Sequence, residues 1–153
     1  MTKGKGFENI LWSFINFNKD TNIGTIQGAD KLDKNGILAN TKFERGSSTT
    51  TLMNAYSQSQ KINTVGLSLQ ASLQASLKDS NHNRNINGII EQLDTIKILT
   101  KDTKLSSLFD GFDKEAIEAE GGIKALKEKV DTLVNSTSKD TTKISDIIGK
   151  VFT

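Results

Sequence analysis

The chain has 153 residues, of which 35% are hydrophobic, and this suffices for one domain or for one domain with a loose arm. Its 20 basic and 18 acidic residues leave a formal charge of +2, a near balance that does not favour a nucleic-acid partner. The absence of cysteine excludes disulfides and thiolate metal sites, and the absence of proline suits long uninterrupted helices.

The first predicted element is an amphipathic helix over residues 7–17. Apolar residues follow helical spacing at Phe7, Leu11 and Phe14, and polar residues occupy the opposite side. Because polar residues interrupt the stretch, it predicts neither a secretory signal nor a transmembrane segment. The composition leans toward an extracellular or particle-associated location, reached without a cleaved signal peptide.

Residues 19–48 carry scattered Gly, Asp, Asn and Thr and predict an irregular arm. The Asn35-Gly36 pair lies between apolar flanks, a pattern typical of a tight turn in a short β-hairpin. The alternative is an irregular loop that becomes ordered only against a neighbour. We therefore divide the chain into an N-terminal helix and arm, residues 1–48, and a helical bundle region, residues 49–153.

Residues 47–77 combine a row of apolar side chains with a single charged residue, Lys61. A Ser-Leu-Gln-Ala repeat places Leu69, Leu73 and Leu77 four residues apart, on a row that winds slowly around a helix. A strand is the competing interpretation, since part of the block alternates apolar and polar residues, but the row is longer than a normal strand. A segment so poor in charge predicts a contact surface.

A polar connection over residues 79–87 precedes the next predicted helix, with Asn87 as its N-cap and Leu99 near its end. A shorter helical piece follows over residues 105–112. Asp113 is then placed to cap another short helix, which runs up to a pair of glycines where we expect a bend or break.

The last thirty or so residues carry the strongest pattern, a heptad row of apolar side chains interrupted by the polar stretch 135–143. We expect a break there and two shorter helices. Val134 and Ile148 widen the apolar stripe to that of a multi-helix bundle. The a and d positions of the row are Ile123, Leu126, Val130, Leu133, Thr137, Asp140, Ile144, Ile147 and Val151.

No set of residues predicts a reaction, a cofactor or a metal. The acidic residues between Asp110 and Glu120 scatter around a helix near lysines, which is typical of a solvated face. A calcium loop at residues 30–44 fails because lysines, Lys31 and Lys42, stand where carboxylates are required. His82 has no partner at catalytic or ligand spacing, so we expect a surface-loop histidine.

The predicted fold is mainly α, a helical bundle or coiled-coil-like set of helices with an irregular N-terminal arm. The predicted function is that of a non-enzymatic structural subunit that assembles with copies of itself, and possible further partners are other assembly proteins. Filaments, needles, sheaths, tails and virion components fit this description. The alternative is a non-enzymatic helical module that binds a protein partner through its loops. The residues predicted to contact other subunits are Phe7, Leu11, Phe14, Leu69, Leu73, Leu77, Ile144, Ile147 and Val151.

Overall fold

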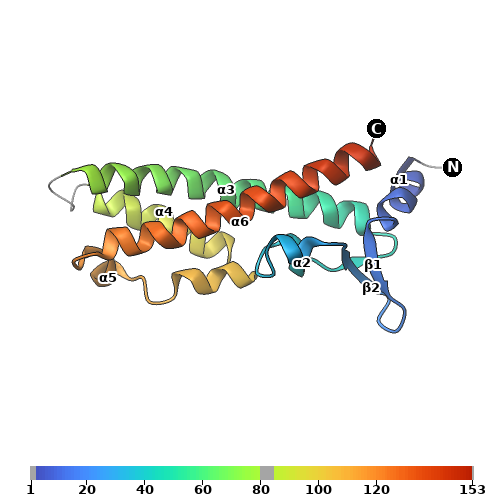
Figure 1. The fold of residues 1–153 in the computed structure, drawn as a ribbon, viewed down its shortest axis with the longest axis horizontal. Coiled ribbons are helices and arrows are strands. Elements are labelled where there is room, and N and C mark those ends of the chain that lie inside the picture. Colours follow the sequence, from blue (N-terminus) through green and yellow to red (C-terminus); the bar gives the residue numbers. More distant parts are fainter. Residues whose placement is uncertain (1–2, 80–84, 153) are drawn as a thin grey trace. The chain divides into compact units, whose positions relative to one another are not determined.

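The computed structural model describes residues 3–79 and 85–152 and shows a mainly α-helical protein with a small antiparallel sheet near its N-terminus (Figure 1). The predicted fold class is confirmed. In chain order the elements are α1 (Lys3–Trp12), β1 (Ile15–Asn18), β2 (Ile23–Ile26), α2 (Ala29–Leu32), the 3₁₀ helix η1 (Leu38–Asn40), β3 (Phe43–Glu44), α3 (Ser48–Lys78), α4 (Ile86–Leu99), the 3₁₀ helix η2 (Lys104–Phe109), α5 (Lys114–Glu118) and α6 (Gly122–Val151).

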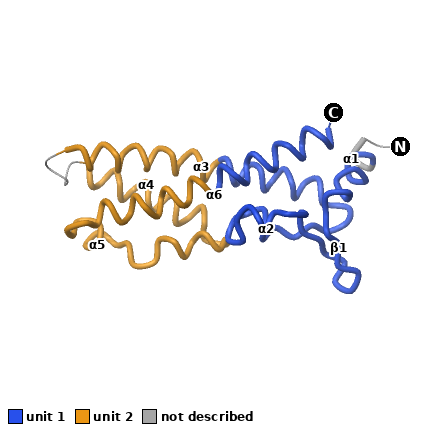
Figure 2. Tube along the Cα trace, viewed as in Figure 1, with its two compact units in different colours: residues 1–60, 136–153 blue, residues 61–135 orange. Residues whose placement is uncertain are grey.

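The chain divides into two compact units (Figure 2). Unit 1 combines residues 1–60 with residues 136–153, whereas unit 2 is the continuous stretch 61–135. Both divisions fall inside long helices, α3 and α6, each of which is uninterrupted. α3 begins at Ser48, and the predicted division of the chain after residue 48 stays a prediction.

The first helix ends earlier than predicted because the residues after it pair with a second strand. α1 stops at Trp12, and β1 runs antiparallel to β2 from the Ile15–Ile26 pair to the Asn18–Ile23 pair. The prediction of helix beyond Trp12 is therefore wrong. The Ile-Asn-Phe-Asn sequence of β1 alternates with period two, which suits a strand with one covered face.

The turn of this hairpin depends on asparagine chemistry. The Asn18 Oδ1 accepts hydrogen bonds from the backbone N–H groups of Asp20 at 2.9 Å and Thr21 at 3.3 Å. Asn22 closes the turn in the left-handed region, with φ +58°, which asparagine tolerates better than most residues. The hairpin of the arm is thus formed by β1 and β2.

The Asn35-Gly36 pair lies in a tight turn, closed by the Gly36 N–H, which donates to the Asp33 carbonyl at 2.9 Å. This turn joins α2 to η1 and has no strands on either side, so the hairpin predicted here is wrong. The Asn40 side chain donates to the carbonyls of Lys34 and Gly36, each at 2.8 Å. These local bonds give the backbone a compact alternative to strand pairing.

α3 buries a stripe in which intervals of four and three residues alternate along its length. This is the spacing of a heptad seam and confirms the predicted helix over the competing strand. A Cβ at Gly66 would lie 3.0 Å from the Val134 Cγ2 of α6, so the missing side chain permits close helix packing in unit 2. The buried positions of α3 are Ser48, Leu52, Ala55, Ser59, Ile62, Gly66, Leu69, Leu73 and Ser76.

α6 runs without interruption through residues 135–143, so the predicted break is wrong. All of the a and d positions of the predicted heptad row are buried, including the polar Thr137 and Asp140. Within this stretch Ser136, Thr137 and Asp140 are buried, and Asp140 receives a hydrogen bond from the backbone of Ile37. Val134 is also buried, as expected for a stripe wider than a two-stranded seam.

Short elements connect the two long helices in unit 2. α4 begins at Ile86 with Asn85 at its N-cap in the left-handed region, so the predicted cap at Asn87 is wrong by two residues. The short piece predicted after α4 is the 3₁₀ helix η2. The capping role of Asp113 is confirmed, because its Oδ1 accepts the Ala116 N–H at 2.8 Å at the start of α5.

Candidate functional site

The nine residues predicted to contact other subunits fall into two groups. Three are half-buried in the single chain, namely Phe7, Phe14 and Leu77. Because the others are already covered by their own chain, their burial does not require a second copy. Those that are buried are Leu11, Leu69, Leu73, Ile144, Ile147 and Val151.

Two of the half-buried residues belong to an apolar surface where α1 meets the end of α6 in unit 1. The ring of Phe7 contacts that of Phe152 in a tilted arrangement, with 4.6 Å between centroids, and Phe152 is 37% exposed. Ile10 lies one turn after Phe7 on α1 and is 44% exposed. The Lys150 Nζ lies 5.8 Å from the ring of Phe14. We call Phe7, Ile10, Phe14 and Phe152 the terminal apolar patch.

α1, the helix that carries Phe7 and Ile10 of this patch, is anchored by one carboxylate. The Glu8 Oε1 accepts hydrogen bonds from the backbone N–H groups of Gly46 at 2.6 Å and Ser48 at 3.4 Å, and Oε2 accepts from the Thr49 Oγ1 at 3.4 Å. These donors lie at the first turn of α3, where unpaired N–H groups and the helix dipole favour a negative charge. Glu8 therefore ties α1 to the start of α3.

An aromatic cluster holds the other end of α1 to the sheet. The Trp12 and Phe17 rings meet edge to face at 5.1 Å, and the Arg45 guanidinium lies 4.6 Å from the centroid of Phe17 and 5.1 Å from that of Trp12. Cation–π and edge-to-face contacts each add to the burial of these rings. Together with Glu8, this cluster fixes the position of α1 within unit 1.

Asp140 is the most unusual polar residue of the described chain, because its carboxylate is fully buried on α6. Its Oδ2 accepts the Ile37 N–H at 2.8 Å, whereas Oδ1 has no hydrogen-bond partner among the described residues. A Cβ at Gly36 would lie within 3.0 Å of both oxygens, so the backbone packs directly on the carboxylate. The buried Ser136 Oγ, one turn away, likewise lacks a partner among the residues described.

Burial raises the pKa of Asp140 from 3.8 to about 6. The backbone N–H groups of Ile37 and Leu38 favour the charged form and lower the pKa, and the charge of Asp33 raises it further. The net result is a carboxyl group that changes charge near neutral pH inside the protein.

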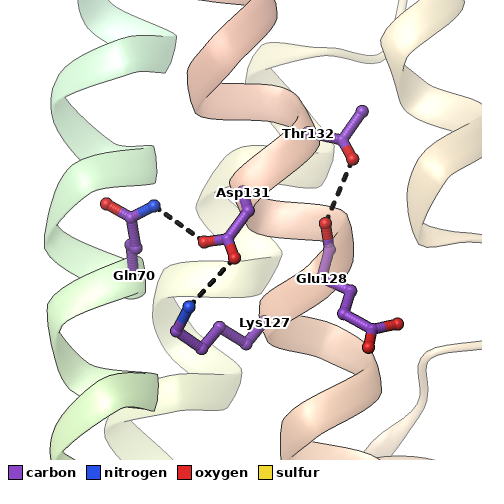
Figure 3. A network of polar contacts seen from close by, with 5 residues as sticks. All are labelled: Gln70, Lys127, Glu128, Asp131 and Thr132. Atoms are coloured by element: carbon purple, nitrogen blue, oxygen red, sulfur yellow. Dashed lines mark hydrogen bonds and ion pairs between the residues drawn. The ribbon is translucent and has the colours of Figure 1, made fainter.

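Asp131 lies nine residues earlier on α6 and is a paired carboxylate, whose pKa shifts in the opposite direction to that of Asp140. Figure 3 shows Gln70 and Lys127 reaching its two oxygens, the Gln70 Nε2 at 2.7 Å from Oδ1 and the Lys127 Nζ at 2.9 Å from Oδ2. Partial burial raises the pKa of Asp131, but both hydrogen bonds and the lysine charge outweigh it, so the pKa lies below its usual value. The nearby Thr132 Oγ1 donates to the Glu128 carbonyl at 3.1 Å and takes no part in this pair.

The described residues bear on the predictions about metal sites and the acidic segment. They contain no group of three or more His, Asp or Glu side chains placed to hold a metal ion. In the predicted acidic segment, Lys114 pairs with Glu118 at 3.9 Å at the surface. The prediction for His82 lies outside the described residues. None of the helices described is both long and apolar enough to cross a bilayer.

Sequence reasoning missed three residues of these sites. Ile10 lies one helical turn from Phe7 on α1, whereas the proximity of Phe152 to Phe7 depends on how α6 returns to α1, and no local pattern encodes that. Asp140 could have been found from its d position in the heptad row, where a carboxylate must be covered. Its partner, Ile37, lies 103 residues away and carries no side-chain signal.

Comparisons with protein families, with characterised proteins and with solved structures find no match to this chain.

Proposed function

We propose that the protein is a non-enzymatic structural subunit that assembles with copies of itself through the terminal apolar patch. The observation that carries the proposal is the contact between the Phe7 and Phe152 rings, with the exposed Ile10 one turn from Phe7. An assembly of this kind would serve as part of a filament, needle, sheath, tail or particle, alone or with other assembly proteins.

The physical support is the free energy of burying apolar surface. Neighbouring apolar side chains left open to water gain roughly 25 cal/mol for each Å² covered, and exposed clusters are typical of protein contact sites. Ile10 and Phe152 are two of the few large apolar residues exposed among the described side chains. Their position on one anchored helix and one helix end gives a partner a defined surface.

A second support is the low charge of α3. The exposed side of this 31-residue helix carries Ser, Thr, Gln, Asn and Ala, with Met53 43% and Leu67 47% exposed. Lys61 and Lys78 are the charged residues of the helix. A face without strong charge avoids like-charge repulsion when identical molecules approach one another.

The decisive experiment measures mass against concentration. Light scattering and negative-stain microscopy of the full chain are expected to show growing polymers or closed rings as the concentration rises. Ile10→Glu places a charge in the patch and should weaken association at least about tenfold while circular dichroism remains helical. A constant monomeric mass at every concentration would refute the proposal.

The matched control uses the same substitution outside the patch. Ile98 on α4 is 74% exposed, so Ile98→Glu should leave both helicity and assembly unchanged. If Ile98→Glu and Ile10→Glu weaken association equally, the effect is one of total charge and the patch is not the interface.

One observation favours the alternative, a module that binds another protein through its arm. An open hollow of about 310 Å³ lies over the sheet of unit 1, and polar residues in its lining include Asn16, Thr25 and Lys42. The side chains of Asn16 and Thr25 face the same side of the β1–β2 pair and make no hydrogen bond within the part of the chain that the structure describes. A fixed small mass in solution would favour this reading over self-assembly.

A further inference from the structure

The segment of residues 33–40, which we call the cover segment, lies over the buried carboxylate of Asp140. The Ile37 N–H of this segment donates to the Asp140 Oδ2 of α6 at 2.8 Å. Gly36 packs against both carboxylate oxygens, and Ile37 and Leu38 are buried. Access of water to Asp140 is therefore controlled by whether this segment is in place.

Among the described residues, no cation pairs with the Asp140 carboxylate. Asp33, at the start of the cover segment, is the charged group that acts on it, and its sign is the same. On α6 itself Lys139 is exposed and Lys143 half-buried, and neither pairs with Asp140 among the described residues. The buried side chains that the other helices of unit 1 contribute are uncharged, namely Leu11, Ala29, Ser48, Leu52, Ala55 and Ser59.

An ionised carboxylate in such a place is costly, because burial removes its hydration and the charge that acts on it, that of Asp33, has the same sign. Two responses relieve the cost. Asp140 can take up a proton while the segment stays closed, or the segment can open and let water reach the carboxylate. Low pH favours the first response and high pH the second.

We propose that the cover segment is a pH-responsive lid, held closed over α6 when Asp140 is protonated and loosened when Asp140 is ionised. Opening uncovers Ile37 and Leu38, which are apolar, together with the carboxylate itself. The inference does not depend on the proposed function.

The experiment is amide hydrogen exchange on the full chain, read by mass spectrometry on peptides that cover residues 33–41. Rates are divided by the intrinsic exchange rate at each pH, so that they report the opening equilibrium. Since burial places the pKa of Asp140 at about 6, protection should fall about tenfold between pH 5 and pH 8, with its midpoint near pH 6. Protection that does not change with pH would overturn the proposal.

Two variants test whether Asp140 controls the opening of the cover segment. Asp140→Asn keeps an acceptor for the Ile37 N–H but cannot ionise, so its protection should be independent of pH, whereas Asp131→Asn should retain the tenfold change. If the protection in Asp140→Asn falls as much as in the wild type, Asp140 does not control the lid.

A further variant covers the case in which Asp140→Asn fails to fold. Asp33→Asn retains an oxygen that can accept the Asn35 N–H but removes the like charge near Asp140, so it should move the midpoint to lower pH. A midpoint that stays in place or moves upward would contradict the assignment.

Discussion

Replacing Asp140 by asparagine should change how the stability of the whole protein depends on pH. The substitution preserves size and an acceptor for the Ile37 N–H, but it removes a carboxyl group that is fully buried. In the wild type, that group binds a proton more strongly in the folded chain than in the unfolded chain. The folded state is therefore stabilised by acid at this position, opposite to the usual behaviour of a paired carboxylate.

The magnitude follows from the pKa. The folded pKa is about 6 and the ordinary value is 3.8, and about 1.4 kcal/mol per pKa unit gives about 3 kcal/mol. This contribution is fully present below pH 3.8 and is lost as the pH rises through 6. Relative to the wild type, Asp140→Asn should therefore gain most of about 3 kcal/mol in unfolding free energy between pH 4 and pH 8.

Urea denaturation followed by circular dichroism, at intervals from pH 4 to pH 8, measures this difference. Asp131→Asn is the matched control on the same helix. The pKa of Asp131 lies below 3.8, so its contribution is lost only as the pH falls, and the difference between this variant and the wild type should stay nearly constant above pH 5. A constant difference for Asp140→Asn over the same range would refute the reasoning.

Three further substitutions, two of them with a matched control, test the packing through the urea concentration at the midpoint of unfolding. Leu69→Ala opens a cavity in the buried stripe of α3 and should cost about 2–5 kcal/mol, whereas Leu67→Ala, at a 47% exposed position, should cost much less. Gly24→Ala places a methyl group against the Ile15 side chain and should cost about 1–3 kcal/mol, while Gly149→Ala, with open space around it, should not destabilise. Glu8→Ala removes the carboxylate at the start of α3 and should cost about 0.5–2 kcal/mol, less at high salt. Equal costs within either matched pair, or a Glu8→Ala midpoint equal to the wild type's, would contradict the packing described.

The sequence predicts the long helices well because their signal is local and repeated. Every a and d position assigned to α6 is buried, from Ile123 to Val151. On α3, Leu69 and Leu73 of the predicted row are buried, but the buried stripe then continues through Ser76 and leaves Leu77 half-buried. Such patterns predict a helix without information on distant residues, because the same spacing of apolar residues recurs along its length.

The errors arise where a distant segment decides the structure. Residues after Trp12 have helical spacing but form β1, because β2 supplies a ladder of backbone hydrogen bonds. The polar stretch around Asp140 predicted a helix break, yet α6 continues and the segment around Ile37 covers the Asp140 carboxylate. The terminal apolar patch was predicted only in part, because one of its members comes from a distant part of the chain. Phe7 and Phe14 were identified from their helical spacing, whereas Phe152 joins them only in the folded chain.

The hydrogen bond between Ile37 and Asp140 also bears on the order of folding, since it joins residues 103 positions apart. Unit 2 is contiguous and can form its contacts while the ribosome is still translating the rest, but unit 1 needs residues from both sides of it. Closing so long a loop carries an entropic cost that contacts near in sequence avoid. We therefore expect unit 2 to acquire protection first, and nascent chains halted before Ser136 to expose the arm to proteases.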